Sequence, residues 1–394
     1  MTREEAMARQ ARREKQARKE AESRELAKGP IDMPFFLLVM LLMGIGLVML
    51  FSASFPWAYY KGWGPAYYLI RQSIFAAMGV STMLLIGKIN YQRFRGLAKL
   101  GLMAAIVLLV LVLIPGIGQT RNNATRWLGI GDILTFQPSE IAKFAVVLYF
   151  SDSISKKKDQ MRTLRYGIVP YALILVVIAG LMMLEPHLSG TVLILGTGAI
   201  LMLVGGIGWG WVLGALGAAA AAGYFLIGVI GYGHSRVAMW LDPWLDRQGD
   251  GYQMVQSLLS IGSGGLLGVG LGKSRQKFQY LPEPQNDFIF SIICEELGLI
   301  GATIIMLLFA ALILRGYWIA LHARDRFGAL LVVGVISLVA MQTFLNIGVV
   351  TGLLPATGIS LPFFSYGGTA LLIQLAEMGV VLSVSRQMKP TKSG

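Results

Sequence analysis

The feature that most constrains this chain is a succession of apolar runs, each close to 20 residues long. A helix needs about 20 apolar residues to cross roughly 30 Å of hydrocarbon. Only 14% of the residues are charged, against about 25% in soluble domains, and the mean hydropathy is +0.64. The pattern predicts an all-α integral membrane protein with ten transmembrane helices, at 33–54, 67–87, 97–117, 134–151, 167–184, 189–206, 209–231, 288–314, 327–350 and 365–385.

The distribution of charge predicts the orientation of these helices. The formal net charge is +13, and much of it falls in short segments between the apolar runs, at 88–99, 151–167, 315–326 and 385–394. Short loops rich in Lys and Arg stay on the cytoplasmic side. We therefore expect both termini to be cytoplasmic. Because the basic residues are dispersed over several loops, nucleic-acid binding is a poor explanation of the charge.

The same pattern divides the chain into a basic cytoplasmic tail (1–32), a polytopic membrane domain (33–385) and a cytoplasmic C-terminal tail (386–394). The tail at 1–32 is expected to be a solvated orientation signal, although its basic residues also suit anionic membrane lipid. Residues 232–286 are too polar to span, so a large extracytoplasmic loop is expected between helices 7 and 8. Long loops of this kind usually carry function.

Asp287 lies where this loop meets the eighth predicted helix. It is either the N-cap of that helix, a position that Asp favours, or a catalytic carboxylate. Lys273, Arg275 and Lys277 precede it and would keep it ionised, as a general base must be. The same three cations suit a pyrophosphate. Of the neighbouring Glu295 and Glu296, one is expected to face a cavity and the other to pack against a neighbouring helix. The sequence does not indicate which glutamate does which.

A second cluster of polar residues opens the fourth predicted helix. Pro138 favours a helix start, and Glu140 and Lys143 are three residues apart, so they share a face. The pair is either an internal ion pair that fixes helix packing or part of a phosphate site. In the second case Lys143 and Arg126 contact phosphate oxygens, and Gln137 and Glu140 position them.

Two further segments depart from the helical pattern. Prolines and glycines interrupt residues 346–372, and irregular backbone at membrane depth is tolerated only where protein or a cavity covers it. Gly367 and Gly368 allow close backbone approach there, although a plain helix-breaking hairpin is the alternative. His187, in the turn at 184–191, is expected to be a packed hydrogen-bonding residue. The glycines around Lys273 lack Walker spacing, which excludes nucleotide binding.

Four segments carry a resemblance to a known family: WLGIGDILTFQPSEIAK, DPWLDRQGDGYQMVQSL, LPEPQNDFIFSIICEELGLIG and GLLPATGISLPFFSYGGTALL. From Pro34 to Arg386 the chain resembles the SEDS family (shape, elongation, division and sporulation), the peptidoglycan glycosyltransferases FtsW, RodA and SpoVE. The residues LPEPQNDFIF and the basic N-terminal tail resemble FtsW and SpoVE more than RodA. The resemblance implies polymerisation of lipid II into β-1,4-linked glycan outside the bacterial plasma membrane, with inversion and release of undecaprenyl pyrophosphate. It also implies a class B penicillin-binding protein, a transpeptidase, as partner.

The resemblance assigns residues as well. Asp287 matches the essential aspartate, and Trp127 joins the motif that lines a central cavity. No ligand cluster demands a metal, although a divalent cation (Mg²⁺ or Mn²⁺) is compatible with a pyrophosphate substrate. His187 stands where the family often has Asp, so no role is carried over to it. The expected substrate-binding residues are Arg126, Trp127, Gln137, Glu140, Lys143, Lys273, Arg275, Lys277, Ser365, Gly367 and Gly368.

Two alternatives remain at this point. A flippase that moves lipid II across the membrane would also have ten helices, an internal charged pair and broken helices. A scaffold that only recruits a transpeptidase would not need Asp287. The place of Asp287 at the predicted outer surface, and not at the membrane midplane where transporters bind their substrates, favours a polymerase.

Overall fold

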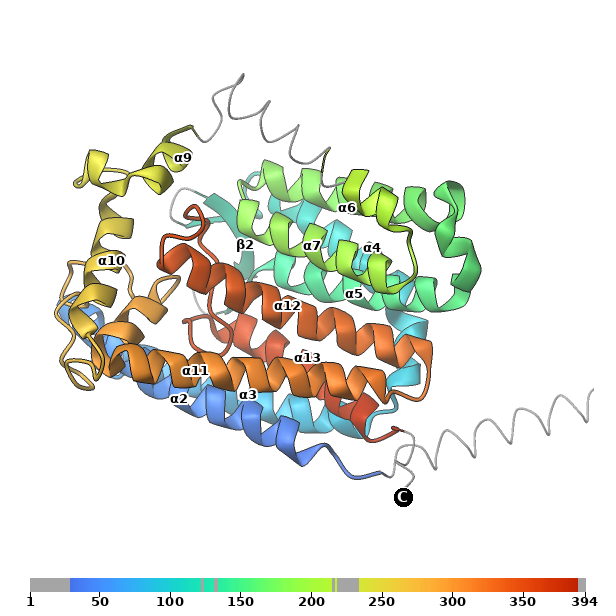
Figure 1. The fold of residues 1–394 in the computed structure, drawn as a ribbon, viewed down its shortest axis with the longest axis horizontal. Helices are drawn as coiled ribbons and strands as arrows, with labels where there is room; N and C mark the ends of the chain where they lie inside the picture. Colours follow the sequence, from blue (N-terminus) through green and yellow to red (C-terminus); the bar gives the residue numbers. More distant parts are fainter. Residues whose placement is uncertain (1–28, 122–123, 131–133, 215–216, 218–233, 389–394) are drawn as a thin grey trace, which may run out of the picture.

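The computed structural model describes residues 29–121, 124–130, 134–214, 217 and 234–388, which form a bundle of long helices (Figure 1). Within these residues seven helices are long and apolar enough to cross a membrane. They are α2 (Met33–Tyr60), α3 (Tyr67–Lys88), α4 (Phe94–Val112), α6 (Val169–Leu184), α11 (Ile289–Leu321), α12 (Arg326–Val350) and α13 (Gly368–Ser385). The prediction of a helical, multi-pass membrane protein is confirmed.

Two further helices occupy predicted spans without meeting the same criteria. The first, α5 (Pro138–Lys157), is less apolar and carries Glu140 and Lys143, whereas α7 (Leu188–Val204) is apolar but short. The predicted span 209–231 lies mostly outside the described residues, so ten remains a prediction. Short turns of η2 (Tyr91–Arg93), η3 (Lys158–Arg162) and η4 (Leu164–Ile168) join the helices.

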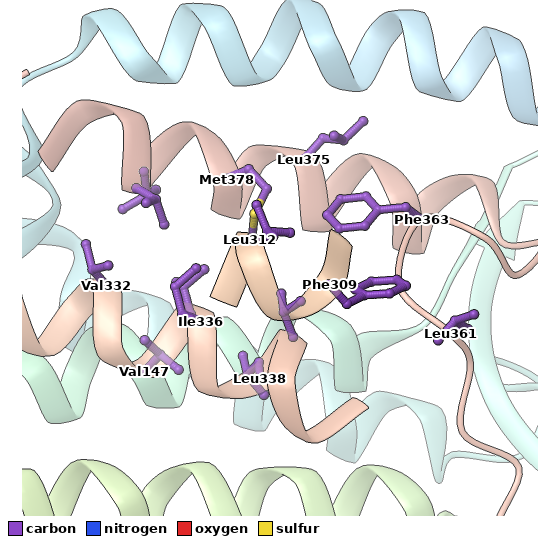
Figure 2. Close-up of a cluster of buried hydrophobic side chains, with 14 of the residues drawn as sticks. Val147, Phe309, Leu312, Val332, Ile336, Leu338, Leu361, Phe363, Leu375 and Met378 are labelled. Atoms are coloured by element: carbon purple, nitrogen blue, oxygen red, sulfur yellow. The ribbon is translucent and has the colours of Figure 1, made fainter. Parts of the chain in front are cut away.

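The core of the bundle is built around α12, which is buried along most of its length. Figure 2 shows its apolar side chains meeting those of α5, α11 and α13, among them Val147, Phe309, Leu312, Val332, Ile336, Leu338, Leu375 and Met378. Truncating such a side chain costs about 2–5 kcal/mol. The helix is also fixed at its start, where Asp325 caps the Gly328 N–H (3.1 Å) and pairs with Arg95 (2.9 Å). This packing makes α12 a rigid support for the loops at its ends.

A small antiparallel sheet interrupts the helices between α4 and α5. Its strands are β1 (Gln119–Arg121), β2 (Ala124–Ile130) and β3 (Leu134–Phe136), with β2 in the middle. The sequence predicted a helix from residue 134, and this was wrong: 134–136 are strand, and the helix begins at Pro138. Proline suits the first position of a helix, whereas the Thr- and Trp-containing segment before it suits a strand.

The segment predicted as an extracytoplasmic loop holds structure of its own. It contains α9 (His234–Leu241), the 3₁₀ turn η6 (Pro243–Asp246) and α10 (Tyr252–Gly264), followed by irregular backbone to residue 288. Figure 1 shows α10 at one end of the bundle, running across the direction of the long helices. The two ends of the described membrane domain meet at the opposite end, where Arg386 Nε donates to the Gly29 carbonyl (2.7 Å).

A candidate active site around Asp287

Asp287 is held by its backbone and presents its carboxylate. Helix α11 starts at Ile289 with Phe288 as N-cap, and no side chain of the described residues caps it, so the N-cap alternative is wrong. The Asp287 carbonyl accepts a hydrogen bond from Asn346 Nδ2 (2.7 Å), which also donates to the Ile359 carbonyl (2.6 Å). The residue is only partly exposed. A carboxylate fixed in this way is suited to act on a substrate.

The surroundings of Asp287 tune its acidity. The carboxyl group lies deep enough among protein atoms that burial raises its pKa to about 6. This value includes the charge of Glu283, which also raises the pKa, and the charge of Arg126, which lowers it. A pKa in this range leaves the group mostly ionised at pH 7 and still able to accept a proton, which is what a general base requires.

Arg126 joins three parts of the site. It lies on β2, where its Nε donates to the Glu185 carbonyl (3.2 Å) and its Nη2 to the Pro186 carbonyl, so the strand is clamped to the end of α6. Its charge lowers the pKa of Asp287, Glu185 and His187. Trp127 follows it on the strand and is partly exposed. The sheet that the sequence missed is therefore what carries the cation of the site.

The turn between α6 and α7 contributes two buried titratable groups. Burial raises the pKa of Glu185 to about 8, and its carboxyl oxygens have no hydrogen-bond partner among the described residues. Burial, together with the charges of Arg126 and Lys143, lowers the pKa of His187 to about 3. The ring is thus neutral, and Gln137 Nε2 donates to it (3.3 Å). His187 is a packed, hydrogen-bonding residue.

The Glu140–Lys143 pair is present and lines a cavity. Lys143 Nζ lies 2.7 Å from Glu140 Oε2, and its side chain is 5% exposed. The cavity has a volume of about 50 Å³, and α12, α13 and the loop before α13 contribute polar side chains to it. One of these is Glu377 of α13, whose strongest charged neighbours are Lys143 and Glu140. Both the packing role and the phosphate role predicted for the pair remain predictions.

Glu377 was missed by the sequence reasoning, although a signal for it exists. It is the one acidic residue of the predicted span 365–385. An ionisable residue within a span faces a bundle interior or a cavity, because lipid exposure is costly. Applied to that span, this rule would have placed Glu377 in the bundle interior or at a cavity.

The loop before α13 connects this cavity to Asp287. Ser365 Oγ donates to the Asn286 carbonyl (2.7 Å) and accepts from the Leu361 N–H (2.7 Å). The Gly367 N–H donates to Gln72 Oε1 (3.2 Å), and a Cβ on Gly368 would clash with the Phe75 ring. Ser365 thus positions the segment that holds Asp287, while Gly368 allows close packing on Phe75 of α3.

Of the three cations predicted to stand beside Asp287, Lys277 is bound elsewhere. Lys277 Nζ is 2.7 Å from Glu296 Oε1, and both side chains are fully buried, so this ammonium is not available to a phosphate. Glu295 accepts from Ser274 Oγ (2.6 Å) and the Arg275 N–H (2.8 Å). The expectation that one glutamate faces a cavity was wrong, because both pin the long loop to α11. Lys273 and Arg275 are exposed on that loop.

The fold and this cluster define a multi-pass membrane protein with a carboxylate-centred site at the end of its helix bundle. A family model described as "Cell cycle protein" (FtsW, RodA and SpoVE) matches residues 32–390. The chain belongs to this family. Stage V sporulation protein E of Bacillus subtilis is 44% identical over 357 residues, covering 90% of this chain and 97% of the relative. A "Probable peptidoglycan glycosyltransferase FtsW" of Geobacter metallireducens is 41% identical over 360 residues, covering 90% and 96%.

Solved structures agree with this assignment. The structure presented as "Structural coordination of polymerization and crosslinking by a peptidoglycan synthase complex" matches with a TM-score of 0.77 at 29% identity, covering 91% of this chain and 98% of the other. The rod shape determining protein RodA of Thermus thermophilus matches with a TM-score of 0.68 at 28% identity, covering 92% and 99%. The fold is thus RodA-like over nearly the whole chain.

Proposed function

We propose that this chain is a peptidoglycan glycosyltransferase that polymerises lipid II into β-1,4-linked glycan on the outer face of the bacterial plasma membrane. The observation that carries the proposal is Asp287. Its backbone is fixed by Asn346, and its carboxyl group has a pKa of about 6 and lies within the influence of Arg126. The names of the relatives support the same activity.

In the proposed mechanism, Asp287 accepts the proton of the 4-hydroxyl group of the acceptor lipid II. The resulting oxygen attacks the anomeric carbon of the growing chain. The bond from that carbon to the pyrophosphate oxygen breaks, so undecaprenyl pyrophosphate leaves with the electron pair and the anomeric centre is inverted. General-base assistance of this kind contributes roughly 10²–10⁴-fold in rate.

The cations of the site would stabilise the leaving group. Negative charge develops on the pyrophosphate as the bond breaks, and fixed positive groups nearby lower the barrier. Arg126, whose charge acts on Asp287, is the best placed. Lys143 is ion-paired with Glu140, as Lys277 is with Glu296, but unlike Lys277 it lines a cavity, where its ammonium would meet a phosphate oxygen that enters. In the proposed mechanism, Arg126 and Lys143 therefore have the role that the sequence suggested for Lys273, Arg275 and Lys277.

The proposal includes an orientation and a partner. Basic short loops favour cytoplasmic termini, and the described ends meet opposite α10, so Asp287 would face outward. The likeness to a peptidoglycan synthase complex supports a class B penicillin-binding protein as partner.

Polymerisation of labelled lipid II tests the function. The full chain, purified with and without a candidate class B penicillin-binding protein, is expected to give glycan ladders, and Asp287→Asn to give none. Asp250→Asn is a matched control, because it makes the same change at an exposed residue of the same long segment. Ladders from Asp287→Asn at the native rate would refute the base assignment.

Lipid II transport is a second candidate, favoured by one observation. Three ionisable side chains, Glu140, Lys143 and Glu377, line a cavity within the bundle, as in many transporters. Transbilayer movement of lipid II in vesicles that depends on Lys143, together with an absence of ladders under every condition, would support transport over polymerisation.

A further inference from the structure

We propose that residues 265–280 form an interfacial segment that seats in a membrane leaflet and binds the headgroups of anionic phospholipids through Lys273 and Arg275. The inference is independent of the polymerase activity, since it makes no use of Asp287. It rests on the hydrogen bonding of the segment, on its exposed apolar side chains and on its charge.

The backbone of the segment is paired with a break in α11. Gly298 has φ of 67°, in the left-handed region, so the helix is interrupted there. The freed groups bond to the segment: the Val269 N–H donates to the Glu295 carbonyl (2.9 Å), and the Leu299 N–H donates to the Gly265 carbonyl (2.9 Å). Irregular backbone at a membrane needs such partners, because lipid supplies none.

The inner side of the segment is held by buried charges. Lys277 is paired with Glu296, and Ser52 of α2 donates to the same carboxylate (2.6 Å to Oε2). Glu295 accepts from Ser274 Oγ. These contacts tie the segment to both α2 and α11, so its outer side is presented in a fixed conformation.

The outer side is apolar. Leu266, Leu267, Leu271 and Phe278 are each more than half exposed, and Leu267 is 79% exposed. Contiguous exposed apolar side chains of this size mark a surface that contacts another molecule or a membrane. The surface continues onto Leu299 and Ile300 of the membrane-spanning α11, which are also exposed. Continuity with a lipid-facing helix identifies the covering phase as lipid.

The positive charge of residues 265–280 favours anionic phospholipids. Residues 265–280 contain no Asp or Glu. Lys277 is neutralised by Glu296, which leaves Lys273 and Arg275 as exposed cations next to the apolar side chains. Neither contributes to the pKa shift of Asp287, whereas Arg126 does. This favours membrane phospholipid over substrate pyrophosphate held at Asp287 as the anion they bind.

A fluorophore at position 267 tests how deeply residues 265–280 enter the lipid bilayer. The native Cys294 is buried, so Leu267→Cys provides a selective labelling site. In vesicles, the label is expected to be quenched by nitroxide-labelled lipids and protected from aqueous iodide, whereas a label at exposed Asp250→Cys should show the reverse. Iodide quenching at Leu267→Cys equal to that at Asp250→Cys would overturn the proposal.

Charge removal tests the headgroup preference. Quenching by nitroxide-labelled phosphatidylglycerol is expected to exceed that by nitroxide-labelled phosphatidylcholine, and Lys273→Gln with Arg275→Gln should abolish the difference. Each cation near an anionic surface is worth roughly fivefold in affinity. The control, Lys61→Gln with Arg247→Gln, removes the same charge from other exposed positions and should keep the difference.

Two outcomes would overturn the headgroup assignment. An unchanged lipid preference in Lys273→Gln with Arg275→Gln is the first. The second is protection of the label by added lipid II while the quenching does not depend on phospholipid charge. That result would make the surface a binding site for the substrate. The Asp287→Asn protein should give native quenching, so failure of the polymerase proposal is distinguishable from failure of this one.

Discussion

Replacing Lys277 with methionine should destabilise the protein by about 3–5 kcal/mol, because it leaves Glu296 as a buried carboxylate without its cation. The native ammonium is 2.7 Å from Glu296 Oε1 and 3.2 Å from Ser52 Oγ, and the two charged side chains have no solvent exposure. Among the residues that the structure describes, Ser52 Oγ and the Ser274 N–H are the two donors that would remain for the carboxylate. Two neutral donors do not replace a buried ion pair.

The free energy of unfolding can be followed through Cys294, the single cysteine, which is buried. A thiol-reactive fluorogenic dye labels it on unfolding in graded sodium dodecyl sulfate. Lys61→Met, at an exposed lysine, is the control and should stay within about 0.5 kcal/mol of the native protein. Lys277→Met with Glu296→Met should recover most of the loss, because both charges are then gone.

The double variant also separates the structural role of Lys277 from the phosphate role predicted for it. If Lys277 only pins the loop, the double variant keeps polymerising lipid II at a rate near that of the native chain. A stable double variant without activity, or a Lys277→Met protein as stable as Lys61→Met, would refute the reasoning.

The remaining predictions concern titration, charge and backbone. Because the pKa of Asp287 in the substrate-free protein is raised to about 6, kcat/KM should fall as the pH drops below about 6, and a kcat/KM independent of pH down to 4.5 would exclude it as the base. Glu185 holds a proton in the folded state between about pH 4.5 and 8, where the unfolded chain does not, so stability should decrease as the pH rises through this window. Glu185→Gln should flatten that slope in unfolding titrations at pH 5 and 8. Lys143→Met removes a cation from the cavity and should raise KM for lipid II a few-fold in polymerisation at varied lipid II; an unchanged KM would leave the Glu140–Lys143 pair as a packing contact only. Gly298→Ala should cost at least about 1 kcal/mol, because its φ is positive and a Cβ would clash with Gly268 N; the dye assay measures this directly.

The length of the apolar runs was enough to predict most of the helices, and Pro138 predicted the start of α5 correctly. Helix formation in lipid depends on local hydrophobicity, which a sequence shows directly. The spacing of Glu140 and Lys143 likewise predicted a shared face, because the geometry of one helix fixes it.

Contacts between distant segments could not be predicted in this way. Lys277 was grouped with Asp287 because they are neighbours in sequence, but its partners are Glu296 and Ser52. Ser52 is 225 residues away along the chain. The choice among partners depends on tertiary packing, for which a local pattern carries no signal. The same holds for Arg126, which reaches the site through a sheet that the apolar pattern did not reveal.

The clamping of α12 has a consequence for the membrane itself. Asp325 fixes one end to the first turn of α4, and Asn346, near the other end, holds the backbone of Asp287. The 25 residues between the ends of the helix span about 37 Å. The height of the carboxylate above the opposite membrane surface is therefore set by the protein, whereas the height of a lipid-borne sugar is set by the bilayer. Turnover should then pass through a maximum as the acyl chain length of the lipids is varied, because Asp287 and the sugar lie at the same height at only one bilayer thickness.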